Sequence, residues 1–252
     1  MFYYFFKREI KDKYLGNLTG FSWIFIQPII TLLIYWFVFD QIFEARFSKD
    51  EQSVGFIVYL AIGFWPWLAF SEAVITSITS VSEKSDLIGK IKIDLKTLVL
   101  ATVTAKFSLH LVGYIVVLTG LIIFNNSLNI YSIFLVLFPL IQLYLFAYAL
   151  GLILSSLQIF VRDTLQLMTT IITLWFFMTP IIYSESFIPE AFRSIIQFNP
   201  LYIPITFIHN AVLGTGDMPW FELLVLLVFT ILLLILAIKI FNKLSSSFED
   251  FK

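Results

Sequence analysis

Long apolar runs alternate with short polar segments along the whole chain. At a helical rise of about 1.5 Å per residue, about 20 apolar residues cross a hydrocarbon core of about 30 Å. Six runs reach this length, and we interpret them as transmembrane spans: residues 21–43, 54–80, 97–124, 128–160, 164–183 and 219–241. The pattern therefore predicts an all-α integral membrane protein with six transmembrane helices.

An amphipathic segment precedes the first span. In residues 2–15, aromatic and aliphatic side chains fall on one helical face and basic side chains lie elsewhere. The apolar face holds Tyr3, Phe6, Ile10 and Tyr14, and the basic residues are Lys7, Arg8, Lys11 and Lys13. Because a basic face opposite aromatic residues suits the membrane surface, we predict an interfacial helix within residues 1–20.

A shorter apolar pattern separates the fifth and sixth spans. Segments 187–198 and 201–213 meet at Asn199-Pro200, and the second segment covers only about 20 Å as a helix. Asn199 is a good N-cap, and Pro200 suits a first helical turn. We predict a re-entrant helical hairpin within residues 184–218; the alternative is a surface hairpin that packs on the bundle. Non-helical backbone at membrane depth requires protein or a water-filled path beside it, which indicates a conduit.

Positive charge is distributed unequally between the two sides that six spans would create. One side would carry the basic residues before span one, in the connector 81–96, at Arg162 and after span six. The opposite loops offer only Arg46, Lys49 and Arg193. The positive-inside rule then predicts that both termini are cytoplasmic and that the hairpin faces outward.

One helical bundle accounts for nearly all of the 252 residues, so we expect a single domain over 1–252. Its parts are the cytoplasmic interfacial helix (1–20), spans one to five (21–183), the hairpin (184–218), span six (219–241) and a cytoplasmic tail (242–252). A composition of 60% hydrophobic and 13% charged residues argues against a soluble core. The chain has no cysteine, which excludes a disulfide framework and a thiolate metal site.

Sequence motifs of catalysis are missing. No Gly-x-x-x-x-Gly-Lys-[Ser/Thr] sequence occurs, so the chain should not bind nucleotide through a P-loop. His110 and His209 lie on different segments without a nearby carboxylate pattern, and we interpret each as hydrogen-bonded within the bundle. We therefore predict a protein that is not an enzyme, with no catalytic residue, metal site or cofactor in this chain and no nucleic-acid partner.

Charged and aromatic residues within the apolar runs are candidates for a path through the membrane. Glu72 and Lys106 are costly in hydrocarbon and could pair, although Lys106 could instead extend to the cytoplasmic interface. Aromatic faces would let a polymer pass without being held tightly. The alternative role for each aromatic residue is packing against lipid. The candidate path or gate residues are Tyr35, Phe64, Trp67, Phe70, Glu72, Trp175, Phe176, Pro180, Tyr183, Asn199 and Pro200.

The connector 81–96 is a candidate docking element. Its Ser85–Lys90 portion can form a short helix across the membrane surface, with Asp86 near the positive end of the helix dipole. Such a helix could enter a cleft on a cytoplasmic partner; the alternative is an ordinary solvated loop. The candidate docking residues at this side are Lys7, Arg8, Asp86, Leu87, Ile88, Lys90, Lys92, Asp94, Arg162 and Asp163.

Several short motifs occur in an order typical of one family. They are Tyr14-Leu15-Gly16 behind the basic start, Trp23 with Pro28, the sequence from Gly63 to Glu72, Arg162-Asp163, the sequence from Thr179 to Tyr183, and Asn199-Pro200. Together they resemble the membrane subunit of ABC exporters of cell-surface polysaccharides, the Wzm/TarG type. One departure is that the second connector often carries prolines in this family, whereas this chain has Lys92-Ile93-Asp94-Leu95.

The resemblance implies a homodimer of six-span subunits in the bacterial cytoplasmic (inner) membrane. It implies two copies of a separate ATPase subunit that binds ATP and Mg, and a lipid-linked glycan as substrate. That glycan would be O antigen-like on an undecaprenyl diphosphate carrier, or a teichoic acid. An ABC permease that exports drugs or lipids is the alternative within transport, and a membrane enzyme acting on lipid-linked sugars is the alternative outside it.

Overall fold

Helices form almost all of the part of the chain that the computed structural model describes, which comprises residues 1–14, 22–42, 55–87, 94–124 and 131–248. The predicted all-α class is confirmed. The α-helices are α1 (Phe2–Tyr14), α2 (Trp23–Trp36), α3 (Phe56–Thr79), α4 (Leu95–Phe124), α5 (Tyr131–Phe160), α6 (Thr164–Met178), α7 (Glu190–Gln197), α8 (Tyr202–Leu213) and α9 (Trp220–Ser245). A π-helical segment, η2 (Phe37–Ile42), extends α2, and η3 (Ser82–Leu87) and η4 (Glu185–Phe187) are short 3-10 helices.

Five helical stretches among the described residues are long and apolar enough to cross a bilayer. They are Phe25–Ile42, Phe56–Lys84, Leu95–Ile123, Phe134–Phe160 and Trp220–Ser245. The predicted fifth span differs, because its helix α6 has 15 residues and covers only about 22 Å. Thr179 ends α6 in an extended conformation, since a residue that precedes a proline avoids the helical region. The short helices α6 and α8 are apolar as well.

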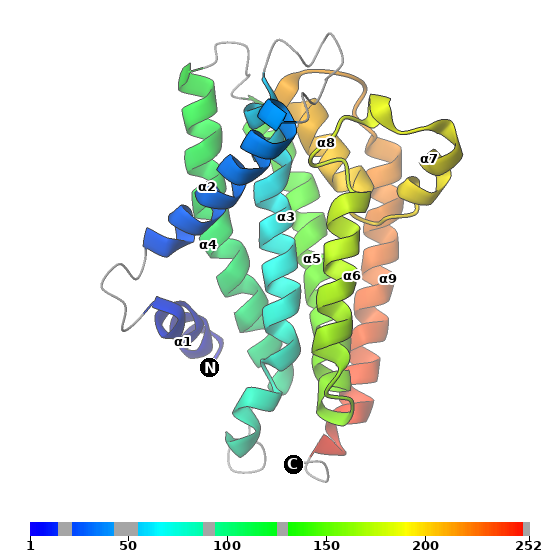
Figure 1. Cartoon of the computed structure of the whole chain (residues 1–252). Coiled ribbons are helices and arrows are strands. Elements are labelled where there is room, and N and C mark those ends of the chain that lie inside the picture. The colour runs from blue at the N-terminus through cyan, green and yellow to red at the C-terminus, as the bar shows by residue number, and fades with distance from the viewer. Residues whose placement is uncertain (15–21, 43–54, 88–93, 125–130, 249–252) are drawn as a thin grey trace.

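Helix α3 occupies the centre of the bundle (Figure 1). It packs against α2, α4, α5, α6 and α8. In its apolar stretch 72% of the residues are buried, compared with 11% in the stretch of α2 and 17% in that of α9. Most of the apolar surface of the outer helices α2 and α9 is therefore not covered by the rest of this chain.

Two glycines allow neighbouring helices to approach α3 closely. A Cβ atom at Gly63 of α3 would lie 2.7 Å from Cε1 of His209 on α8. A Cβ atom at Gly113 of α4 would lie 2.6 Å from Nε1 of Trp65 on α3. In hydrocarbon, helices associate through close packing rather than through the hydrophobic effect, so such small residues determine which helices can touch.

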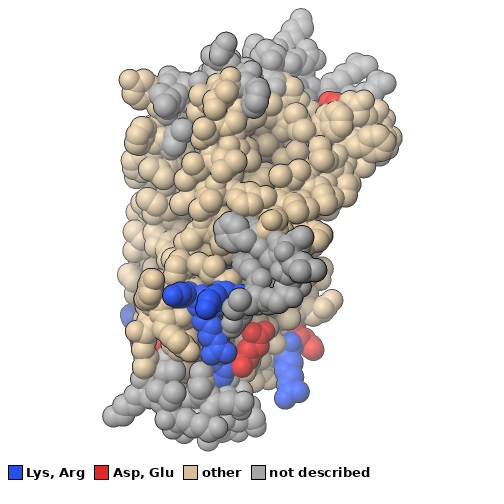
Figure 2. Space-filling view, turned by 90° about the vertical axis from the view of Figure 1, so that its left-hand side faces the viewer, with Lys and Arg blue, Asp and Glu red and all other residues tan. Residues whose placement is uncertain are grey.

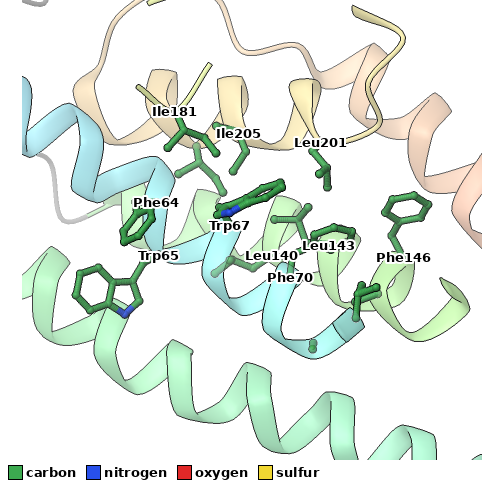
Figure 3. Close-up of a cluster of buried hydrophobic side chains, with 14 of the residues drawn as sticks. Phe64, Trp65, Trp67, Phe70, Leu140, Leu143, Phe146, Ile181, Leu201 and Ile205 are labelled. Atoms are coloured by element: carbon green, nitrogen blue, oxygen red, sulfur yellow. The ribbon is translucent and has the colours of Figure 1, made fainter. Parts of the chain in front are cut away.

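An apolar core joins α3, α5 and α8 (Figure 3). Phe70 of α3, Leu143 of α5, and Leu201 and Ile205 at the start of α8 are all fully or almost fully buried there. Fully buried side chains of this size are enclosed by many atoms at van der Waals distance, and those contacts sum to a large stabilisation. The short helix α8 is thereby fixed against the long helices.

Helix α1 packs on α4 and lies beside the lower half of the bundle (Figure 1). Among its described side chains, Phe5 is buried and packs on Leu98 and Ala101 of α4, whereas Tyr3 from the predicted apolar face is exposed. In Figure 2, Lys and Arg side chains gather across the lower third of this side of the molecule. The described surface above them is uncharged apart from an acidic side chain near the top.

The predicted hairpin consists of two unequal helices at the opposite end of the bundle (Figure 1). No residue of α7 is buried, whereas nine residues of α8 are. Helix α8 starts at Tyr202 with Leu201 as its N-cap, so the predicted N-cap Asn199 is two residues too early. The Asn199 side chain still satisfies an amide of this turn, because its Oδ1 accepts a hydrogen bond of 3.0 Å from the Leu201 N–H.

We predict that Gly63→Ala destabilises the protein by about 1–3 kcal/mol, since the added methyl group would overlap the His209 ring and displace α8. Thermal unfolding of the detergent-purified protein measures this as a lower midpoint. Gly120→Ala is the matched control, because a Cβ atom at Gly120 meets nothing within 4 Å. Equal midpoints for the two variants would contradict the close approach of α3 and α8.

Candidate functional site

The predicted path aromatics come together in one cluster. The ring of Tyr35 on α2 stacks on Phe176 of α6 with centroids 5.4 Å apart, and Phe176 lies 5.6 Å from Trp67 of α3. Phe64 of α3 lies 5.8 Å from Tyr35. Four helices meet at this cluster, because Phe70 of α3 and Trp175 of α6 extend it to Phe146 of α5.

Burial divides these residues into two groups. Phe64, Trp67, Phe70 and Phe176 are buried within the single chain, so they pack the interior. Tyr35 and Trp175 are only partly buried. Ring pairs in these geometries contribute about 0.5–1.5 kcal/mol each beyond the area they bury. The cluster therefore holds α2 and α6 side by side against α3.

A polar cluster lies between α3 and α4. Nε2 of His110 is 2.7 Å from Oε2 of Glu72, and Nζ of Lys106 is 4.0 Å from the other oxygen, Oε1. The side chains of Lys106 and His110 are each only 8% exposed, and that of Glu72 is 35% exposed. Lys106 therefore lies beside Glu72 instead of extending to the interface, which keeps the two charges from standing alone in hydrocarbon.

His110 is a member of this cluster that the sequence did not reveal. The expected hydrogen bond within the bundle is present, but its partner Glu72 is 38 positions away, so no nearby pattern in the sequence indicated it. The contact exists because α3 and α4 pack side by side and bring the two residues to the same level. The spacing of Lys106 and His110 did indicate that these two residues lie together, because residues four positions apart share a face of a helix.

Tyr59 links the ends of two short helices to α3. Its hydroxyl lies within donating distance of the carbonyls of Pro180 (3.3 Å) and Tyr183 (3.2 Å), in the non-helical segment after α6. Its ring stacks on His209 of α8 with centroids 3.9 Å apart, and Nε2 of His209 lies 3.0 Å from the Tyr59 carbonyl oxygen. Buried carbonyl groups need such donors, because no water reaches them in a membrane.

The remaining gate candidates form the junction between α6 and α8. Pro180 and Asn199 are buried, and Nδ2 of Asn199 donates to Oγ1 of Thr179 at 2.8 Å. The hydroxyl of Tyr183 donates to the carbonyl of Phe177 at 3.0 Å. Pro200 is partly buried next to Asn199. The junction is thus tied internally by side-chain hydrogen bonds as well as by Tyr59.

Helices α2 and α6 also share a property that sequence patterns alone did not indicate. Each exposes large apolar side chains on the side away from α3, among them Leu33 and Phe37 on α2 and Leu174 and Phe177 on α6. On α6 this surface also carries three exposed threonines, whose hydroxyls each donate to the carbonyl four residues earlier: Thr169, Thr170 and Thr173. We call this combined surface the α2/α6 face.

The predicted docking residues that the structure describes lie on α1, directly before α4 and in the turn between α5 and α6. Lys7 and Arg8 are exposed on α1, and Arg162 and Asp163 are exposed in the turn between α5 and α6. Asp94 caps α4, since its Oδ1 accepts a hydrogen bond of 3.2 Å from the backbone N–H of Lys96. The side chains of Asp86 and Leu87 and the residues Ile88, Lys90 and Lys92 lie outside the described part of the chain.

The connector starts as a 3-10 helix, η3, over Ser82–Leu87, and the rest of the predicted short helix, residues 88–90, lies outside the described part of the chain. Lys84 in η3 forms an ion pair with Glu9 of α1, and its Nζ lies 5.7 Å from the centroid of the Phe5 ring. Both charged side chains are largely buried. This pair, which spans 75 positions of sequence, joins the interfacial helix to the connector.

Comparison with known proteins agrees with this architecture. The profile of the ABC-2 type transporter family matches residues 1–213. The chain is 26% identical over 250 residues to an O-antigen export system permease protein RfbA of Myxococcus xanthus, covering 97% of this chain and 92% of the relative. Two proteins of Klebsiella pneumoniae with the same name are 27% and 25% identical, each covering 96% of this chain and 91% of the relative.

These matches extend over the helices that form the aromatic cluster, the polar cluster and the α6–α8 junction. The long apolar helices independently identify a multi-pass membrane protein. The chain therefore belongs to the ABC-2 type transporter family, as a membrane permease subunit of a transporter.

Proposed function

We propose that this chain is the permease subunit of an ATP-driven exporter that moves a lipid-linked polysaccharide across the bacterial cytoplasmic membrane. The observation that carries the proposal is end-to-end similarity: three relatives named O-antigen export permeases align with 96–97% of this chain and 91–92% of their own length. The substrate class would be an O antigen-like glycan on an undecaprenyl diphosphate carrier, or a teichoic acid.

The α2/α6 face is the proposed wall of the path. A polymer with many hydroxyl groups needs a surface that tolerates both water and lipid chains, and α6 offers exposed threonines among apolar side chains. Their hydroxyls already donate to the α6 backbone, so they hold passing sugars only weakly. Two copies of the chain with these faces toward each other would enclose such a path, which supports a homodimer.

A six-span topology accommodates the short helix α6. Its helical part is too short to cross the bilayer, but the non-helical segment after it is hydrogen-bonded to Tyr59 and Asn199. Irregular backbone at membrane depth is stable when it is enclosed by protein or borders a water-filled path. The predicted path residues Pro180, Tyr183 and Pro200 all lie at this junction, which supports an outer gate at this level.

Both termini would be cytoplasmic, and the energy would come from a partner. The Lys and Arg side chains in the lower part of Figure 2 lie in the same half of the molecule as α1 (Figures 1 and 2). The positive-inside rule would make this half the cytoplasmic side. Two ATPase subunits, which would bind ATP and Mg, would dock there. Asp86, Leu87, Ile88 and Lys90 would enter the ATPase, and α1 would brace them through the Glu9–Lys84 pair.

We predict that loss of this chain in the source bacterium removes the polysaccharide from the cell surface and leaves lipid-linked glycan inside the cell. Staining of surface glycan and chromatography of extracted lipid-linked oligosaccharides measure the two effects. A plasmid copy of the chain should restore export, and this is the control. Unchanged surface glycan combined with greater drug sensitivity would instead favour an exporter of drugs.

We predict that Thr173→Trp on the α2/α6 face slows export about tenfold, because a bulky ring in the path would raise the barrier to passage by about 1.4 kcal/mol. Val228→Trp on α9 is the matched control, since Val228 is likewise exposed but lies outside this face. Export is normalised to the amount of protein in the membrane. Equal rates for the two variants would show that α6 does not line the path.

We predict that Glu9→Lys or Lys84→Glu alone weakens co-purification with the ATPase and reduces export, because each change places like charges side by side. The double exchange, Glu9→Lys with Lys84→Glu, should restore both, since it re-forms the pair in the opposite sense. Quantitative affinity pull-down of the ATPase is the measurement. A double variant that is no better than the single ones would contradict the proposed brace.

A further inference from the structure

A cavity of about 230 Å³ lies between α3, α4 and α5, apart from the α2/α6 face. Leu111 of α4 and Leu137 and Ile141 of α5 line it and are also 37%, 44% and 55% exposed, so they form its mouth. All three residues belong to helical stretches that are apolar enough to cross the bilayer. The cavity therefore opens sideways toward the hydrocarbon rather than toward either aqueous side.

Small side chains of α3 leave this space open. Pro66 and Ala69 lie three positions apart on one face of α3, and both line the cavity and are buried. The two neighbouring helices present larger side chains to the same space, among them Phe107 of α4 and Leu140 of α5. The floor of the cavity, which consists of Pro66 and Ala69, is thus a part of the central helix that its neighbours do not fill.

Two aromatic contacts hold the neighbouring helices in place around the cavity. The Trp65 ring packs on α4 so closely that a Cβ atom at Gly113 would lie 2.6 Å from its Nε1. The rings of Phe107 on α4 and Tyr144 on α5 meet edge to face, with centroids 5.3 Å apart. Aromatic rings are rigid and a packed interior is barely compressible, so α4 and α5 do not close over the floor. The cavity is therefore a fixed feature of the bundle.

Two of the hydroxyl groups in the wall are bonded to each other. The hydroxyl oxygens of Thr104 on α4 and Tyr144 on α5 are 2.8 Å apart. Thr104 donates its own hydrogen to the carbonyl of Leu100 at 2.7 Å, so Tyr144 is the donor in this pair. Both hydrogens are thus used within the protein. An occupant needs no polar group at this part of the wall, and most of the remaining lining is aromatic or aliphatic.

A cavity of this kind takes an apolar occupant. An apolar cavity of about 150 Å³ in a protein interior stays dry and binds small apolar molecules such as benzene or xenon. The cavity beside α3 is larger, and its mouth is in direct contact with hydrocarbon. Methylene groups that enter it supply van der Waals contacts that the atoms of the wall would otherwise lack.

The depth of the mouth determines which part of a lipid reaches it. Leu111 is 16 residues from Leu95 and 13 residues from Phe124, the two ends of α4, which correspond to about 24 Å and about 20 Å of helix. The mouth is therefore far from both bilayer surfaces and meets the ends of hydrocarbon chains rather than headgroups. Phospholipid acyl chains form the bulk of this hydrocarbon, and occupancy rises with the concentration of the ligand.

We propose that this cavity is a binding site for one acyl chain of a membrane phospholipid. The end of the chain enters between Leu111, Leu137 and Ile141 and lies on the floor, while the headgroup stays at the bilayer surface. The bound chain completes the packing of α3 between α4 and α5. The site is separate from the path proposed on the α2/α6 face, because no residue named for that face lines the cavity.

Phosphatidylcholine that carries a diazirine tests this site in the purified protein reconstituted into nanodiscs. With the diazirine near the end of the acyl chain, we expect cross-links to Trp65 and Ala69, mapped by peptide mass spectrometry and normalised to labelling of the exposed Leu232 on α9. Trp65 and Ala69 are 2% and 4% exposed on the central helix, so a chain reaches them only through the cavity. With the diazirine beside the ester group, their labelling should fall at least about tenfold, because that part of the chain stays near the bilayer surface.

Ala69→Leu should fill the site with the protein's own side chain. Labelling of Trp65 by the chain-end probe should then fall about tenfold, and the thermal unfolding midpoint should stay at or above that of the natural protein. Ala73→Leu is the matched control, because Ala73 lies one turn further along α3, is fully buried and does not line the cavity. Its extra atoms should overpack the core and lower the midpoint by about 3 °C or more.

The comparison of the two diazirine positions needs no variant, so it holds even if a substitution disturbs folding. Cross-links confined to exposed residues such as Leu111 and Leu232 would show that no chain enters the cavity. An Ala69→Leu midpoint as low as that of Ala73→Leu would show that protein already fills the space. Stronger labelling of Trp65 by a diazirine-bearing farnesyl phosphate would assign the cavity to an isoprenoid chain. Each of these three results would overturn the proposal.

Discussion

The attachment of two short helices to α3 is the constraint on which the rest of the structure depends. Helix α6 ends early and α8 covers only part of the bilayer, so the backbone between them cannot satisfy itself within one long helix. The Tyr59 hydroxyl places its single hydrogen between two carbonyls of that backbone, the Tyr59 ring stacks on His209, and Gly63 provides the space for the His209 ring. Without water in the hydrocarbon, these contacts decide whether the junction can exist at membrane depth.

Helix α3 consequently separates two environments. One side carries Phe64 and Trp67, which meet the aromatic residues of α2 and α6. Another side carries Trp65, which packs against Gly113 of α4, and Glu72, which contacts His110 of α4. A transporter that changes the spacing of α2 and α6 during its cycle must move or strain these contacts, because a close-packed interior transmits displacement. The central helix is thus the physical link between the aromatic cluster and the polar cluster.

Much of the architecture follows from patterns within single segments. The long apolar helices, the amphipathic helix α1 and a helical pair near Asn199-Pro200 were all predictable, since each depends on composition and spacing within one continuous segment. We predicted that the fifth span continues to residue 183, because the apolar run continues past Pro180. The proline itself indicated that the helix ends earlier, as α6 does. A 3-10 helix occupies Ser82–Leu87, and the burial of its Lys84 against α1 depends on a distant residue, Glu9.

The sequence by itself determined that this protein is a multi-pass membrane protein, and it located the long apolar helices. Those properties depend on transfer of side chains and backbone into hydrocarbon, which each segment experiences separately. Only the tertiary structure decided that Glu72 meets His110, that Glu9 meets Lys84 and that Tyr59 holds both α6 and α8. Such pairings depend on which helices can approach closely, and that is set by the shapes of whole packed surfaces.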